Sequence, residues 1–173
     1  MPAEEGQAAA SPPPLPEGRF DGREAFGGVV RAALANAAGQ GWNEVVFSDP
    51  DFADWPLGER AAIEALRAWS ASGRRFVMLA QRFDVIERVH ARFLPWRRMW
   101  DHIIECRSLR GTAGVQTVPS AIWTPGWFMH RIDPERSRGA CGFDPRARRE
   151  LRETFDEAWR AARPAFPATT LGL

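Results

Sequence analysis

The sequence predicts an α/β domain in which helices flank a mixed, mostly parallel sheet. Three observations carry this prediction. A strand, a helix and a second strand follow one another over positions 43–80, two more strands lie on either side of Pro125 and Gly126, and an amphipathic helix follows over positions 145–162. With 173 residues, of which 45% are hydrophobic, the chain is long enough for one such domain.

Residues 1–18 differ in composition from the rest of the chain. They are mostly Ala, Glu, Ser and Pro, and four of the prolines stand within positions 12–16. Because proline fixes an extended backbone and lacks an N–H donor, such a segment forms no helix or central strand. We therefore expect a disordered leader over residues 1–18 and a single α/β domain over residues 19–173.

Helices and strands alternate in the first half of the domain. Apolar residues recur at three- and four-residue intervals over positions 25–37, after a capping residue at Asp21, which predicts a helix. Residues 43–49 and 75–80 read as buried strands, and a helix from 58 to 72 lies between them. This order predicts the βαβ unit of a parallel sheet.

The second half begins with a helix near Asp84, which Pro95 is expected to kink or divide. Residues 102–109 read as a third strand of the parallel sheet. Residues 120–124 and 127–133 read as two strands joined by a tight turn, and they predict an antiparallel edge.

The helix from Pro145 to Ala162 has the strongest signals in the chain. Asp144 precedes it as a cap, and Pro145 fits its first turn. Its apolar stripe consists of Ala147, Leu151, Phe155, Ala158 and Trp159. The tail over residues 164–173 is apolar enough to pack back on the domain.

The order of these elements, with the stretches SAIWTPGWFMHRID and GACGFDPRARRELRETFDEAW, resembles one half of the phospholipase D-like superfamily. In that family an early helix precedes a strand ending in Asp, and a late pair of strands precedes a helix that ends in Phe and Trp. The resemblance covers residues 20–162. Because active members place two such halves face to face, and this chain is long enough for one half, the resemblance also implies a homodimer.

The catalytic signature of that family, His-x-Lys followed by Asp, is missing. All 23 basic residues are arginines, so no lysine can hold a phosphate. The nearest match begins at His130, but Ile132 stands in the place of the lysine and Asp133 follows too soon. In the alignment that we favour, the family His and Lys fall near Ser120 and Ile122. The resemblance therefore implies a degenerate member without the usual active site.

Two histidines are the candidate catalytic residues. His130 lies between Met129 and Arg131 in a strand, where alternation turns it either toward the core or toward a groove. His90 lies on a helix beside Val89, where it lines a cleft or sits at a packed edge. A general base needs a positioned partner, and the sequence does not show that Asp133 or another acid supplies one.

Carboxylates follow the first buried strand. Asp49, Asp51 and Asp54 stand at its carboxyl end, where open parallel sheets bind ligands, so oxygen coordination of Mg²⁺ is one interpretation. Turn and cap chemistry is the other. The spacing does not match a calcium-binding loop, because the glycine and the distal Glu of that pattern are missing. We expect no cofactor and no metal, and Asp49 and Asp51 remain the candidate metal ligands.

Arginines alternate with aromatic residues over positions 92–110. Arg97, Arg98 and Trp100 combine guanidinium groups for phosphate with a ring for base stacking, and we take them with Arg131 as candidate ligand-binding residues. The alternative is a helix whose aromatic face belongs to the core and whose arginines are solvated.

Composition limits the function classes. The formal net charge is +1, and beyond residue 18 arginines exceed acids by four, which is too mild for a strong nucleic-acid binder or a membrane-surface protein. The amino terminus does not read as a signal peptide and no apolar run is long enough to cross a membrane, so we expect a cytoplasmic protein. The two cysteines, Cys106 and Cys141, read as buried reduced thiols.

We therefore expect a non-catalytic binding or accessory domain that recognises a phosphate-bearing ligand or a nucleic acid. One alternative is a phosphoester hydrolase with a non-standard His and Arg site. The other is a structural protein-interaction module that uses some of the eight tryptophans.

Overall fold

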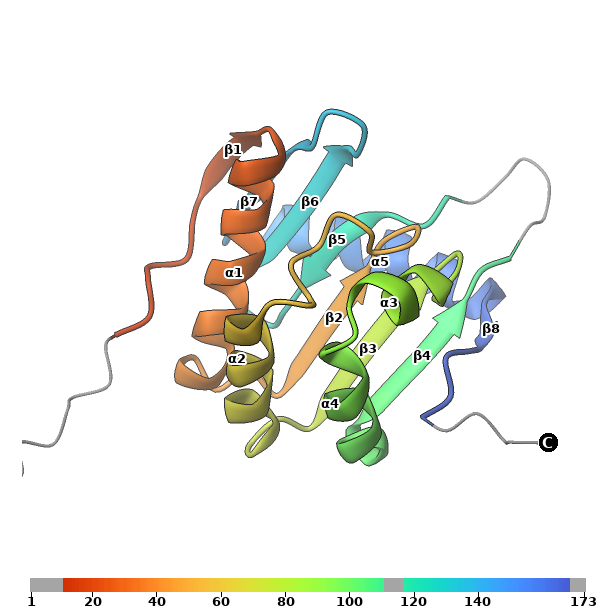
Figure 1. Cartoon of the computed structure of the whole chain (residues 1–173). Helices are drawn as coiled ribbons and strands as arrows, with labels where there is room; N and C mark the ends of the chain where they lie inside the picture. The colour runs from red at the N-terminus through yellow and green to blue at the C-terminus, as the bar shows by residue number, and fades with distance from the viewer. Residues whose placement is uncertain (1–10, 111–116, 169–173) are drawn as a thin grey trace, which may run out of the picture.

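A single eight-stranded sheet runs through the computed structural model, which describes residues 11–110 and 117–168 (Figure 1). The strands are β1 (Gly18–Asp21), β2 (Glu44–Ser48), β3 (Arg75–Ala80), β4 (Ile104–Ser108), β5 (Ser120–Trp123), β6 (Phe128–Asp133), β7 (Arg138–Gly142) and β8 (Arg163–Pro164). The α-helices are α1 (Arg23–Gly39), α2 (Arg60–Ser70), α3 (Asp84–Val89), α4 (Phe93–Met99) and α5 (Pro145–Ala161). The α/β class expected from the sequence is confirmed.

The strand order across the sheet is β1-β7-β6-β5-β2-β3-β4-β8. Strands β2, β3 and β4 are parallel neighbours, as expected. Every other neighbouring pair is antiparallel. The expectation of a mostly parallel sheet is therefore wrong, because β1, β7 and β8 were not anticipated and each of them adds antiparallel pairing.

Each predicted helix is present, with two differences in detail. Asp21 does not cap the first helix, because it lies in β1 and Gly22 occupies the N-cap position of α1. The break in the third predicted helix falls at residues 90–92, between α3 and α4, and not at Pro95. Pro95 lies in the first turn of α4, where a residue without an N–H loses no intrahelical hydrogen bond. Asp144 caps α5 as predicted, since its carboxylate accepts hydrogen bonds from the backbone N–H groups of Arg146 and Ala147.

Helices cover both faces of the sheet (Figure 1). The larger core lies on the face that α1, α2 and α4 cover, and it includes Phe26, Trp69, Phe76 and Trp96. A smaller core on the opposite face packs Phe155 of α5 and its neighbours against the strands. The most buried tryptophans are therefore part of the hydrophobic core.

The amino-terminal segment is packed on the domain over residues 11–17. It forms no helix or strand, but the carbonyl of Pro13 accepts a hydrogen bond from Asn36 (2.6 Å) and that of Pro16 accepts one from the indole of Trp127 (2.9 Å). The expectation of a disordered leader is wrong for these residues, because buried donors on the domain bind their carbonyls. Residues 1–10 of the predicted leader lie outside the described part.

At the other end of the described chain, Phe166 is buried and its ring stacks on Phe83 with centroids 5.0 Å apart, so this part of the tail packs back as expected. Both cysteines are free and buried, also as expected. Among the described residues, no helix has the length and apolar character needed to cross a membrane.

Candidate functional site

A buried carboxylate lies at the end of β2, and both of its oxygens accept hydrogen bonds. Asp49 follows β2 directly, and its Oδ2 accepts hydrogen bonds from the backbone N–H groups of Phe52 (2.8 Å) and Asp51 (3.2 Å). Its Oδ1 accepts a hydrogen bond from Nη2 of Arg131 (2.9 Å). Asp49 therefore caps the turn after β2 and forms an ion pair with a guanidinium.

Arg131, which lies on β6, connects the antiparallel part of the sheet to this carboxylate. Its Nε donates to the hydroxyl of Ser120 (2.9 Å) on β5, and its Nη1 lies 3.4 Å from both Asp54 Oδ2 and Ser137 Oγ. The guanidinium carbon lies 4.2 Å from the centroid of the Phe26 ring in α1. Since all three nitrogens have acceptors inside the fold, this candidate ligand-binding residue lies in the interior.

The carboxylates of Asp49 and Asp51, the candidate Mg²⁺ ligands, accept hydrogen bonds from nearby backbone N–H groups and do not point toward one shared position. Asp51 turns its Oδ1 toward the backbone N–H of Ala53 (2.9 Å), which is a turn contact. Within residues 11–110 and 117–168, no group of three or more His, Cys, Asp or Glu side chains is placed to hold a metal ion. The geometry around Asp49 and Asp51 matches the turn interpretation.

The two candidate catalytic histidines lie in different parts of the fold. His90 is buried after α3, with Nε2 2.8 Å from the carbonyl oxygen of Phe52, so it supports the loop after β2. His130 points to the face of the sheet opposite Arg131, because successive residues of a strand alternate. Burial lowers the pKa of His130, and in the described chain no hydrogen bond joins it to Asp133 or Asp144.

The predicted ligand-binding residues of α4 are divided between interior and surface. Arg97 is buried, and it donates to Asp101 Oδ1 (2.7 Å) and to the carbonyl of Phe166 (2.9 Å), so it fastens the C-terminal segment. Arg98 is exposed, and Trp100 is half-buried with its ring near His102. Arg97 and Arg131 are both enclosed, so the structure does not bring the four candidate ligand-binding residues together on one surface.

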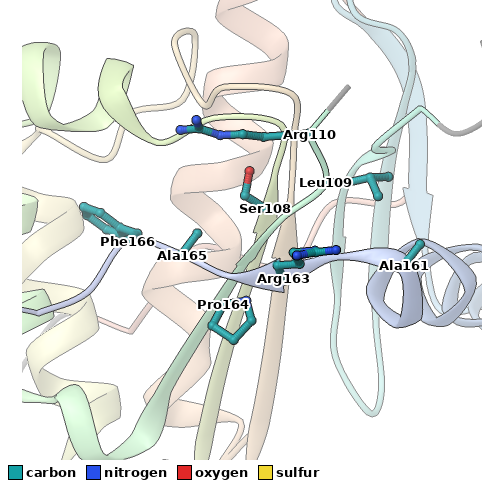
Figure 2. Close-up of a pocket in the computed structure, with 8 residues that line it drawn as sticks. All are labelled: Ser108, Leu109, Arg110, Ala161, Arg163, Pro164, Ala165 and Phe166. Carbon is teal, nitrogen blue, oxygen red and sulfur yellow. The ribbon is translucent and has the colours of Figure 1, made fainter. Parts of the chain in front are cut away.

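A cavity of about 620 Å³ lies where β4, β8 and the end of α5 meet (Figure 2). We call it the arginine cavity; it is lined by Ser108, Leu109, Arg110, Ala161, Arg163, Pro164, Ala165 and Phe166. Arg110 and Arg163 are both exposed and lie on two sides of Ser108. The hydroxyl of Ser108 donates to the carbonyl of Gln81 (2.7 Å), which ties the ends of β3 and β4 together.

Charge distinguishes this cavity from two others in the described chain. Its lining has two arginines and no carboxylate. A second cavity of about 570 Å³ has Arg19 and Arg138 opposed by Asp21 and Asp133. A third, of about 220 Å³, has Arg97, Arg98 and Glu87, and Arg97 is already paired with Asp101. Of the three, the arginine cavity alone has an excess of two positive charges.

Arg110 and Arg163 are not among the residues that the sequence predicted to bind a ligand. Arg110 follows β4 at its carboxyl end, as Asp49 follows β2, and this position at the end of a parallel strand is the signal that could have identified it. Arg163 carried no such signal, because the two-residue strand β8 that places it beside Ser108 has no sequence pattern of its own.

No protein-family model and no curated protein sequence match this chain. Among solved structures, the fold is similar to that of TrmBL2, described as an archaeal chromatin protein that shows a novel mode of DNA binding. The TM-score is 0.61 at 13% sequence identity, and the match covers 90% of this chain and 56% of that one. The chain thus spans little more than half the length of that protein, and the similarity is one of fold.

Proposed function

We propose that this chain is a non-catalytic binding domain that recognises backbone phosphates of a nucleic acid through the arginine cavity. The observation that carries the proposal is the pair Arg110 and Arg163, which line one cavity without a carboxylate to neutralise them. An anion bound there gains the interaction with both charges and displaces no internal ion pair.

Guanidinium chemistry favours phosphate as the anion. A guanidinium is planar, stays charged at all relevant pH values and offers parallel N–H donors that match two phosphate oxygens. Arg110 follows β4 and Arg163 lies in β8, so they can approach one phosphate from two directions. The apolar part of the lining, which includes Leu109 and Pro164, leaves room for a sugar or base beside the phosphate.

Two features favour nucleic acid over other phosphate-bearing ligands. The domain shares its fold with part of a protein described as binding DNA. Both arginines are exposed, so a long polyanion reaches them without entering an enclosed site. Backbone phosphates contribute most of the affinity in such complexes.

The proposal assigns no catalysis to the chain, because neither candidate histidine has the surroundings of a general base. The ring of His90 is held by a backbone carbonyl, and His130 has no hydrogen bond to Asp133. We further infer that the fold is a degenerate phospholipase D-like half. This inference is supported by the neighbouring strands β2, β3 and β4 and by Ser120, whose hydroxyl accepts the Nε–H of Arg131 where the family has a catalytic residue.

The test is a titration of fluorescently labelled single-stranded and duplex DNA with the purified chain, followed by anisotropy at several salt concentrations. We expect binding that weakens with salt. The double variant Arg110→Ala/Arg163→Ala should bind more weakly and show a salt slope reduced by roughly 1 for each lost phosphate contact.

The matched control is Arg67→Ala/Arg74→Ala, which removes the same charge from exposed positions outside the cavity. If both double variants lose affinity equally, binding follows overall charge and the proposed site is wrong. Absence of DNA binding by the unmodified chain at low salt would refute the function itself.

A further inference from the structure

Strand β1 is one of the two terminal strands of the sheet, and β8 is the other. Strand β1 comprises Gly18–Asp21, pairs with β7 on one side, and has no neighbour on the other side in the strand order of the described residues (Figure 1). An uncovered strand edge presents backbone N–H and C=O groups that can pair with another strand.

The direction of these groups follows from the antiparallel ladder. The N–H of Gly22 donates to the carbonyl of Ser137 (3.1 Å), which continues the β1–β7 register of Phe20 with Gly139. Since hydrogen-bonding direction alternates along a strand, Gly18 and Phe20 face β7. The N–H and C=O groups of Arg19 and Asp21 therefore point away from the sheet.

The sequence of this edge is complementary to itself. When a second copy of β1 pairs antiparallel about Phe20, Arg19 stands opposite Asp21 of the copy, and the converse pair forms by symmetry. Each pair brings opposite charges together and exchanges two backbone hydrogen bonds. Both side chains are exposed, whereas Phe20 is buried on the other face.

In the single chain, the charges of Arg19 and Asp21 remain available for pairing with a second copy. Asp21 accepts a hydrogen bond from Arg138 Nε (3.0 Å), and both side chains of that pair are more than half exposed. A carboxylate has room for a second guanidinium. Among the described residues, Arg19 forms no ion pair in the single chain.

We propose that two copies of this chain associate through antiparallel pairing of their β1 strands into one continuous sheet. The occupant of the free edge is thus a second copy, selected by the Arg19 and Asp21 complementarity. The contact is short compared with the interfaces of permanent dimers, so the association depends on protein concentration. This proposal does not depend on DNA binding at the arginine cavity.

Sedimentation velocity of the full chain over a range of concentrations tests the proposal. Asp21→Arg and Arg19→Asp each place like charges opposite one another twice, and each should weaken association by about tenfold. The double variant Arg19→Asp/Asp21→Arg restores opposite charges between copies and should restore association. It does not restore the Asp21–Arg138 contact, so recovery reports pairing between copies and not repair of the single chain.

Glu153→Arg, an exposed charge reversal on α5, is the control and should leave association unchanged. Amide hydrogen exchange gives an independent measurement: rising concentration should slow exchange at Arg19 and Asp21 and leave Phe20 unchanged. A chain that stays monomeric, or a dimer that responds to neither single variant, would overturn the proposal, as would failure of the double variant to recover in a chain with unchanged thermal stability.

Discussion

Arg131 Nη2 and Asp49 Oδ1 lie 2.9 Å apart in an ion pair that is almost completely shielded from solvent, with side-chain exposures of 3% and 2%. The pair joins β6, in the antiparallel part of the sheet, to the end of β2, in the parallel part. Removing two charges from water is costly. The hydrogen bond that Arg131 donates to Ser120 and the backbone N–H groups that donate to Asp49 in the turn after β2 compensate for that cost. The pair fixes how the two parts of the sheet meet.

Replacing Arg131 by Met should therefore strongly destabilise the domain, because Asp49 would be left as a buried charge without a counterion. We expect a loss of about 3–5 kcal/mol in the free energy of unfolding, measured by urea denaturation. Arg23→Ala is the control, since Arg23 also pairs with an Asp but is 79% exposed, and it should cost about 0–1 kcal/mol. Equal losses in the two variants would contradict the structural role of the buried pair.

Gly139→Ala should disrupt the pairing of β6 with β7. A Cβ at this position would collide with the carbonyl oxygen of His130 and lie 2.8 Å from the Cα of Arg131, and neither backbone atom can move freely within a sheet. Thermal or urea denaturation should show a loss of about 1–3 kcal/mol. Gly28→Ala on α1 has open space around the new methyl group and should instead stabilise the domain by about 0.4–1 kcal/mol.

Stability should fall at alkaline pH because of Cys106. Burial is the largest cause that raises the pKa of this thiol from 9.0 to about 12, so the unfolded chain releases the proton first. Between pH 9 and 12 the unfolded state binds fewer protons than the folded state, and the free energy of unfolding decreases as pH rises.

The chain has no lysine or tyrosine, so the thiols of Cys106 and Cys141 are the side chains expected to titrate in this range. Cys106→Ala should flatten the decline, and the residual slope should belong to Cys141, whose pKa burial raises to about 11. Denaturation profiles from pH 8 to 11.5 provide the measurement. An unchanged slope in the variant would show that the Cys106 thiol is accessible to water.

His130 should titrate below the ordinary histidine value of 6.5, because burial disfavours its charged form and lowers its pKa. As pH falls below 6.5, the unfolded chain takes up this proton before the folded chain does, so stability decreases in that window. An NMR titration of the imidazole protons gives the pKa. His130→Gln should remove this part of the acid destabilisation, and a measured pKa above 6.5 would indicate an acidic partner that the structure lacks.

Much of the framework could be predicted from the sequence, because periodicity and capping are local signals. The stripe from Leu151 to Ala158 and the cap at Asp144 identified α5, and both appear in the structure as expected. The apolar runs of β2 and β3 likewise identified the parallel pair. These residues are buried in patterns that repeat with the period of their own element.

Strands β1, β7 and β8 could not be predicted in this way. β7 has the sequence RGACG, in which Gly139 is required for close approach to β6 and contributes no side chain to a pattern. β8 has two residues and exists only because β4 offers a free edge. Such strands depend on pairing partners far away in the sequence, and the expectation of a mostly parallel sheet was wrong for that reason.

The candidate site was hard to predict from the sequence for the same reason, because its contacts join residues that are far apart in the chain. Arg131 lies two residues from Met129, so strand alternation already placed it on the face of a core residue, which is the signal that could have identified it as buried. The sequence could not show that Asp49, 82 positions earlier, would meet it. Arg97 is enclosed because Phe166 covers it, again from a distant segment.

The two edges of the sheet differ in how readily another strand can pair with them. Residues 163–165 cover the outer edge of β4. Arg163 pairs with Ser108, and the N–H of Ala165 donates to the carbonyl of Cys106 (3.0 Å). That side of the sheet ends in β8, which has only two residues, and Pro164 has no N–H to donate, so it offers few groups for strand addition. The β1 side is consumed when it pairs with its own image. An assembly built in this way terminates at two chains and cannot propagate into a filament.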